Sequence, residues 1–214
     1  MGVASGVSPV AVGRTGLTPG ATGVSGINFA NAEVEPVAAI HPANPKLLLA
    51  AWQQDRWSNG GARALVSAVS SDGGANWEPV RVIYTPAPAA GAGSSQTIGN
   101  RIVVPTAGVA RGVLVNVFLQ IDTVAGNQTS RVAVNRSSDR GLTWAVPVFI
   151  AEQRTGGNRD ALTGQSIRDG GIIPNIAAGP ATLLADVWML TSRDGATWAE
   201  TRVSSTSLDA SQAP

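Results

Sequence analysis

The chain contains the segment Ser70-Ser71-Asp72-Gly73-Gly74-Ala75-Asn76-Trp77, and two later segments repeat its pattern. The second is Ser137-Ser138-Asp139-Arg140-Gly141-Leu142-Thr143-Trp144, which fits Ser-x-Asp-x-Gly-x-x-Trp at every position, as the first does. The third is Ser192-Arg193-Asp194-Gly195-Ala196-Thr197-Trp198, which keeps the four residue types but has one spacer fewer. Similar segments at regular intervals indicate a repeat architecture. The chain is therefore expected to contain three related units.

A proline in a strand-like stretch precedes each of the three segments. These prolines are Pro36, Pro105 and Pro174, and neighbouring prolines are 69 residues apart in both intervals. The prolines and the Ser-Asp-Gly-Trp segments therefore share one period. Two independent markers in the same phase strengthen the prediction of a repeat.

The residue types of the segment suit a tight turn between two antiparallel strands. An aspartate can accept hydrogen bonds from the backbone N–H groups of its own turn, and glycine permits a positive φ. The tryptophan is expected to fold over the hairpin and bury its ring. Residues 63–69 before the first turn and 80–84 after it are strand-like, as is the apolar run 47–52. The residues expected to build the three turns are Ser70, Asp72, Gly74, Trp77, Ser137, Asp139, Gly141, Trp144, Ser192, Asp194, Gly195 and Trp198.

These segments resemble the BNR or Asp-box repeats of sialidases and related β-propellers, over roughly residues 33–204. The resemblance implies an all-β fold of four-stranded antiparallel blades, with each box joining the third and fourth strands. It predicts blades at about 33–84, 100–151 and 171–204. A Gly/Ser-rich leader at 1–32 and a tail at 205–214 are expected to flank them.

The third blade is expected to be incomplete. The interval from proline to box aspartate is 36 residues in the first repeat and 34 in the second, but only 20 in the third. Residues 183–190 would then be the single middle strand of that blade. Propellers close with about 4–8 blades. We therefore expect a partial propeller, whose open blade edges would allow a homo-oligomer to form.

Four polar segments are expected to form loops on the face opposite the boxes, where sialidases hold their substrate. They are residues 53–61, 85–100, 121–127 and 151–171. Merely solvated loops are the alternative interpretation, because loops are generally polar and lie at the surface. The candidate substrate-binding residues are Arg56, Trp57, Asp122, Arg154, Arg159 and Arg168.

Asp55 is the candidate catalytic residue, because the resemblance implies an acid/base carboxyl group after the second strand of the first blade. The same resemblance calls for an arginine that binds a carboxylate through paired hydrogen bonds, but Val34 occupies its place. The tyrosine and glutamate of a sialidase site belong to later blades. Tyr84 is the only tyrosine of this chain and is expected to pack in a strand.

Three functions remain open. The chain could be a sialidase-like glycoside hydrolase that acts on terminal sugars of glycans, with Asp55 as acid/base. It could instead be a non-catalytic propeller module that binds a glycan, a glycoconjugate or a protein. The third alternative is a truncated fragment without a function of its own.

Composition excludes several other classes of function. The chain has 214 residues, a net charge of +1, no cysteine and one histidine, His41, in a turn-like His-Pro segment. A net charge this close to zero gives no indication of nucleic acid as a partner. No apolar run is long enough to span a membrane. No cofactor is expected beyond an incidental calcium ion held by loop carboxylates. The family resemblance implies an extracellular protein, although no signal peptide is visible.

Overall fold

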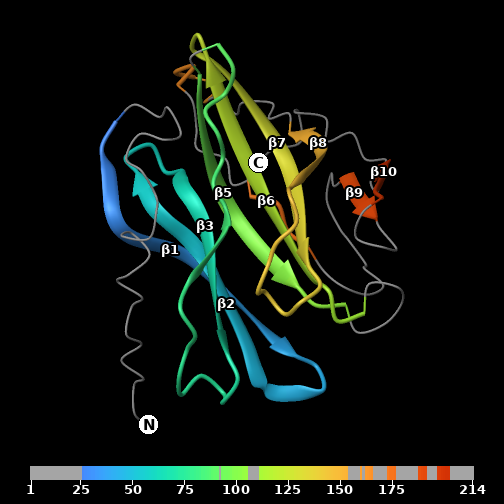
Figure 1. Cartoon of the computed structure of the whole chain (residues 1–214). Helices are drawn as coiled ribbons and strands as arrows, with labels where there is room; N and C mark the ends of the chain where they lie inside the picture. Colours follow the sequence, from blue (N-terminus) through green and yellow to red (C-terminus); the bar gives the residue numbers. More distant parts are fainter. Residues whose placement is uncertain are drawn as a thin grey trace.

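The computed structural model describes residues 26–91, 93–105, 111–153, 160, 162–165, 173–176, 188–191 and 197–202. Within these residues the protein is all-β and contains no helix. Eight strands form one antiparallel sheet that is not closed into a ring, and two more form a separate hairpin (Figure 1). The all-β prediction is therefore confirmed.

The large sheet consists of two successive meanders, in each of which every strand pairs with the next. The first meander contains β1 (Asn28–His41), β2 (Asn44–Trp57), β3 (Ala62–Ser70) and β4 (Arg81–Tyr84). The second contains β5 (Ser94–Val103), β6 (Leu114–Val124), β7 (Asn127–Ser137) and β8 (Val148–Gln153). A single residue pair, Ala62 with Thr97, joins β3 to β5. The separate hairpin consists of β9 (Trp188–Thr191) and β10 (Ala199–Arg202).

The central strands are almost continuously buried. Every residue of β3 is buried, and so are the first nine residues of β6. A strand that is covered on both faces has no exposed side on which polar residues can alternate. The polar residues of these strands, such as Ser67 and Asn116, are accordingly buried along with the apolar ones.

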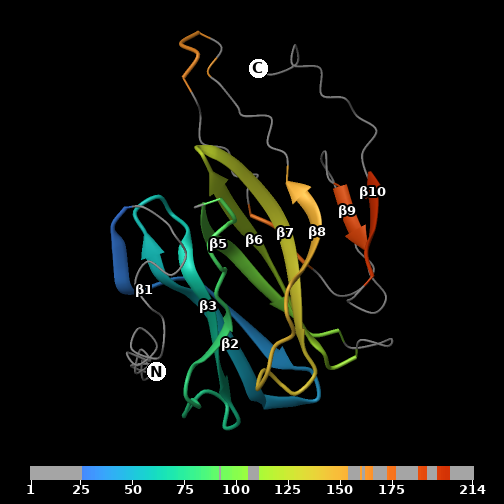
Figure 2. The ribbon, with the colours of Figure 1, turned by 45° about the horizontal axis from the view of Figure 1, so that its top comes forward.

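The two meanders share one hydrophobic core. The rings of Tyr84 on β4 and Phe118 on β6 lie with their centroids 5.3 Å apart. Figures 1 and 2 show β1–β3 and β5–β8 running beside each other. The buried members of this core are Leu49, Ala51, Leu65, Val69, Ile83, Ile102, Leu114, Phe118 and Ala133.

The other face of the second meander has a core of its own. Val115, Val117 and Val134 are buried there, and the half-buried Ile176 and Trp198 pack against them. The third repeat therefore contacts the second meander on the face opposite the first meander. Consecutive repeats pack in sequence order.

The register of the strands shows that the meanders are equivalent. The box serines Ser70 and Ser137 pair with Leu48 and Leu114, respectively. When these pairs are aligned, Trp52 of β2 corresponds to Phe118 of β6. Each meander therefore places a large aromatic residue four positions after the residue that pairs with its box serine.

The first box is held by hydrogen bonds to one carboxylate. Ser70 Oγ donates to Asp72 Oδ1 at 2.9 Å, and the Asn76 N–H donates to the same oxygen at 2.9 Å. The Asn76 side chain donates to Asp72 Oδ2 at 2.7 Å. Gly74 N donates to Ser70 Oγ at 2.9 Å. The turn between β3 and β4 thereby satisfies most of its own donors, and the Gly73 N–H donates to the Lys46 carbonyl of β2 at 2.9 Å.

The second box repeats this pattern between β7 and β8. Ser137 Oγ donates to Asp139 Oδ1 at 2.7 Å, and the Thr143 N–H donates to that oxygen at 2.9 Å. The Thr143 hydroxyl donates to Oδ2 at 2.5 Å, and Gly141 N donates to Ser137 Oγ at 2.8 Å. Thr143 occupies the position of Asn76, which the sequence pattern leaves free. The position before the tryptophan therefore contributes a side-chain donor in both boxes.

Gly141 is required both by its backbone angle and by packing. Its φ is 86°, in the region that favours glycine. A Cβ at this position would lie 2.6 Å from Cδ1 of Leu49 on the first meander. The second box turn is therefore packed directly against the first meander.

The tryptophans of the boxes are less buried than expected. Trp77 is 42% exposed, so the prediction that its ring is buried is wrong. Trp144 is half-buried and packs against the shared core. Ser192, Asp194 and Gly195 of the third box lie outside the described residues, as do residues 183–187 of the expected middle strand.

Several boundaries differ from the sequence-based expectation. β1 starts at Asn28, inside the segment 1–32 that was expected to be a leader. β5 starts at Ser94, so residues 94–100 belong to a strand rather than to a linker. The turn predicted around His41 is confirmed: β1 ends at this residue, and His41 Nδ1 accepts a hydrogen bond from Ala43 N at 3.2 Å.

The box carboxyl groups are expected to titrate far below the ordinary aspartate pKa. Hydrogen bonds from the Asn76 backbone and side chain lower the pKa of Asp72 from 3.8 to about 2. The Thr143 hydroxyl and backbone N–H do the same for Asp139, also to about 2. Because folding lowers both values, the resulting stabilisation is present above pH 3.8 and is lost as the pH falls through about 2.

Carboxyl-detected NMR titration of Thr143→Ala tests this origin. We expect the pKa of Asp139 to rise towards 3.8, while the pKa of Asp72 stays at about 2 as an internal control. A wild-type Asp139 that titrates near 3.8 would contradict the observed box geometry.

Candidate functional site

The polar residues of the sheet gather at the end away from the two box turns. Both boxes follow the last residues of β3 and β7, so the opposite end is formed by the start of these strands and by the end of their antiparallel partners. We call this region the polar end. It contains two side-chain networks, one centred on Asp55 and the other on Asp122.

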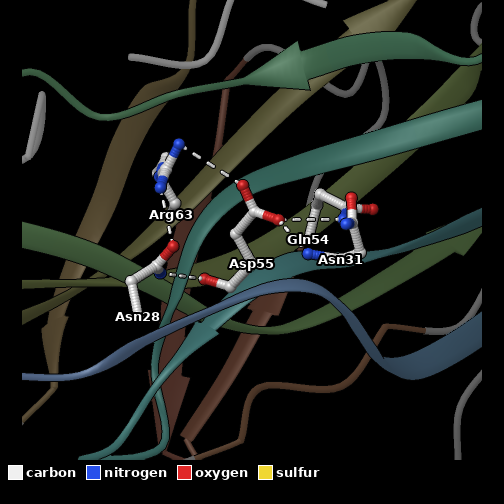
Figure 3. Close-up of polar contacts among 5 residues, drawn as sticks. All are labelled: Asn28, Asn31, Gln54, Asp55 and Arg63. Carbon is white, nitrogen blue, oxygen red and sulfur yellow. Dashed lines mark hydrogen bonds and ion pairs between the residues drawn. The ribbon is translucent and has the colours of Figure 1, made fainter. Parts of the chain in front are cut away.

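Asp55 lies within β2 and is 1% exposed. Its Oδ1 accepts hydrogen bonds from Asn31 N at 2.8 Å and from Gln54 Nε2 at 3.0 Å. Its Oδ2 lies 3.4 Å from Nη1 of Arg63, which is also buried. Figure 3 shows the carboxylate between Arg63 on one side and Asn31 with Gln54 on the other.

Asn28 completes the Asp55 network. Its side-chain nitrogen donates to the main-chain carbonyl of Asp55 at 2.9 Å, and its Oδ1 accepts from Arg63 Nη2 at 2.6 Å (Figure 3). The network therefore ties the first half of β1 to β2 and β3. A buried charge is tolerated when it is both paired and hydrogen-bonded.

The backbone around this network is unusual. Asn31, Glu35 and Asp55 have positive φ values of 64°, 52° and 59°. The register of β1 on β2 also shifts between Phe29 and Glu33, and again between Val34 and Val37. Non-glycine residues adopt such angles at a cost that their surroundings must offset. The hydrogen bonds of the Asp55 network supply that compensation at Asn31 and Asp55, and Glu35 accepts a hydrogen bond from the Gln53 side chain.

The structure corrects the expected placement of Asp55, Arg56 and Trp57. All three belong to β2, which runs to Trp57, rather than to an exposed loop. Asp55 is buried and engaged by three donors. Trp57 is 4% exposed and has no open face for a sugar ring, while Arg56 is half-buried.

Asp122 was expected in a loop, but it lies in β6, which continues to Val124. Its Oδ1 accepts hydrogen bonds from Ser95 Oγ at 2.6 Å and from Gln120 Nε2 at 2.8 Å. Its Oδ2 forms an ion pair with Arg131 of β7. Burial alone would raise the pKa of Asp122, but these three donors lower it below its ordinary value, so the group is ionised at neutral pH.

Tyr84 connects the Asp122 network to the first meander. Its hydroxyl donates to Gln120 Oε1 at 2.7 Å, and its ring packs on Phe118. Burial, followed by the charge of Asp122, raises the pKa of the Tyr84 hydroxyl. The phenol therefore stays protonated and holds Gln120 in place.

Arg131 of β7 and Phe149, the second residue of β8, form an accessible pair beside the polar end. The guanidinium carbon of Arg131 lies 3.9 Å from the centroid of the Phe149 ring, on β8. The Arg131 side chain is 37% exposed and Phe149 is 40% exposed. Sequence analysis missed both residues, because neither follows a turn signal. Aligning β6 with β2 through the residues that pair with the box serines matches Gln120 to Gln54. Only this alignment would have drawn attention to the strand face that carries Gln120.

The remaining candidates lie outside the part of the chain that the structure describes. These are Arg154, Arg159 and Arg168. Among the described residues, no group of three or more histidine, aspartate or glutamate side chains could hold a metal ion. The same residues include no helix suited to crossing a bilayer.

Comparison with known proteins does not supply a function. No protein-family model matches the chain, and no curated protein matches its sequence. The geometry of the polar end is therefore the basis for the functional proposal.

Asp55→Asn is expected to lower the free energy of unfolding by about 3–5 kcal/mol, because it leaves the buried Arg63 without its counter-ion. Adding Arg63→Met should restore part of the loss by removing the unpaired charge. Urea denaturation measures both effects.

Glu78→Gln is the matched control. It removes a carboxylate from an ion pair with Arg81 that is accessible to solvent, and it should cost less than about 1 kcal/mol. If Asp55→Asn were as mild as this control, Asp55 would not have the structural role assigned to it.

Proposed function

We propose that the chain is a non-catalytic glycan-binding module built from sialidase-like Asp-box propeller blades, and that it binds terminal sugars at the polar end. The observation that carries this proposal is the repetition of one turn. Asp72 and Asp139 accept the same set of hydrogen bonds between the third and fourth strands of two successive meanders. This is the arrangement that the Asp-box resemblance implies.

The packing of the meanders supports the blade interpretation. The first and second meanders share a core, and Trp198 of the third repeat packs on the far face of the second meander. Propeller blades stack in this serial manner around a central axis. The open sheet fits a module that supplies only part of a ring.

The position of the exposed groups supports binding at the polar end. A sugar offers hydroxyl groups to polar side chains and a less polar C–H face to aromatic rings. Arg131 and Phe149 provide both kinds of surface side by side. Asp122 lies directly behind them and fixes the arginine.

Burial of Asp55 argues against hydrolysis. Most glycoside hydrolases need two carboxyl groups that flank the glycosidic bond, one of them as proton donor. Asp55 is paired with Arg63 inside the sheet, and Asp122 is paired with Arg131. Val34 also stands where the resemblance calls for an arginine that binds a carboxylate.

A second candidate function is assembly with another protein or with a second copy through an open edge. Among the described strands, β8 lies at one edge of the sheet. Val146, Val148 and Phe149 beside this edge are 85%, 54% and 40% exposed. Exposed apolar edge strands favour pairing with another chain. In either case, the family resemblance would place the protein outside the cell.

A glycan panel and a fluorogenic sialoside test the proposal on the full chain. We expect retention of at least one class of glycan and no release of the fluorophore. A folded sample, as judged by its NMR spectrum, that retains no glycan would overturn the binding proposal. Hydrolysis that disappears in Asp55→Asn, measured where that variant is still folded, would overturn its non-catalytic part.

A further inference from the structure

The balance of charge at the polar end sets the class of sugar that it can accept. We infer that Asp122, Arg131 and Phe149 form a site for a neutral saccharide with neighbouring hydroxyl groups, rather than for an acidic sugar. This inference rests on the proposed glycan-binding function and specifies its ligand.

Arg131 is already neutralised by the protein. Its guanidinium forms an ion pair with Asp122, which is ionised at neutral pH. Glu152 lies directly opposite Arg131 on β8, which adds a second carboxylate to the same strand region. The other arginine of the polar end that carries an ion pair, Arg63, is buried against Asp55. A carboxylate ligand at Arg131 would therefore lie beside two carboxylates, Asp122 and Glu152, and one arginine.

The donors of the site suit the hydroxyl groups of a sugar. Arg131 is donor-only, and one of its terminal nitrogens is directed at Asp122 Oδ2. Asp122 is 9% exposed and its Oδ1 is occupied by Ser95 and Gln120, so it holds the arginine from behind. The remaining donors of Arg131 suit hydroxyl oxygens, which accept hydrogen bonds and carry no charge. A ligand carboxylate would also accept from Arg131, but it would lie close to the charge of Asp122.

Phe149 supplies the apolar contact and helps to hold the arginine. Its ring lies against the guanidinium of Arg131, yet 40% of the residue remains exposed. Stacking on an aromatic ring and an ion pair together restrict the arginine to one orientation. Tyr84 restrains Gln120, which in turn restrains Asp122. The site is thus arranged before a ligand binds, which reduces the entropy lost on binding.

The test compares a neutral and an acidic probe on the same folded chain. Isothermal titration with methyl β-galactoside, methyl α-mannoside and the methyl glycoside of N-acetylneuraminic acid measures the preference. We expect at least one neutral glycoside to bind about tenfold more tightly than the acidic one. Arg131→Gln should weaken neutral binding about tenfold or more, because it removes a charge-assisted donor.

Two further variants keep the result interpretable. Phe149→Leu leaves the Asp122–Arg131 ion pair in place and should also weaken neutral binding. Arg111→Gln is the control, because it removes an exposed arginine at the box end of the sheet. Its neighbour Gly112 lines a small apolar pocket at that end. This variant should leave the affinity for the neutral glycoside unchanged. Circular dichroism establishes that each variant is folded.

The outcomes separate the inference from the function on which it rests. Binding of the acidic glycoside alone would overturn the neutral-sugar inference and leave the glycan-binding proposal standing. Neutral binding that is unchanged in both Arg131→Gln and Phe149→Leu would overturn the assignment of the site. Failure of every probe here, together with an empty glycan panel, would overturn both proposals.

Discussion

In each meander, one turn connects the third strand to the fourth. Hydrogen-bond donors of this turn converge on a single aspartate. Asp72 and Asp139 accept hydrogen bonds from the hydroxyl of a serine, a backbone N–H and a side-chain donor, so most donors of each turn are satisfied within the turn itself. Because the second turn is compact and contains Gly141, it can lie against Leu49 of the first meander. The close packing of the two meanders, and with it the shared core, depends on that compactness.

The opposite end of the sheet is built on a different principle. There the chain buries ionised groups and satisfies them with partners from distant strands. Asp55 is held by β1 and β3, and Asp122 by β5, β6 and β7. Removing one member of a buried pair is costly, whereas a well-satisfied pair gives a single geometry. Arg131 and Phe149 extend from this framework to the surface and lie against each other, which makes them candidates for contact with a ligand.

The sequence was sufficient to predict those features of the fold that depend on residues close together in the chain. The box residues, the strands that flank the first box and the turn at His41 all follow from short-range patterns. It placed 53–57 and 121–124 in loops because these residues are polar. Their burial depends on partners that are far away in sequence: Asn28 is 27 residues from Asp55 and 35 from Arg63. No local pattern predicts such a partner. The same long-range pairing places Asp55, the expected catalytic residue, inside the sheet and not in an open loop.

The central claim is that the first and second meanders stack through one shared core, and NMR tests it most directly. The chain has one tyrosine and three phenylalanines, so the ring protons of Tyr84 and Phe118 can be assigned with little ambiguity. With ring centroids 5.3 Å apart, the two rings should show strong nuclear Overhauser effects. Their observation in the full chain is the predicted result. A folded chain that shows no such effect between these rings would contradict the stacking of the two meanders.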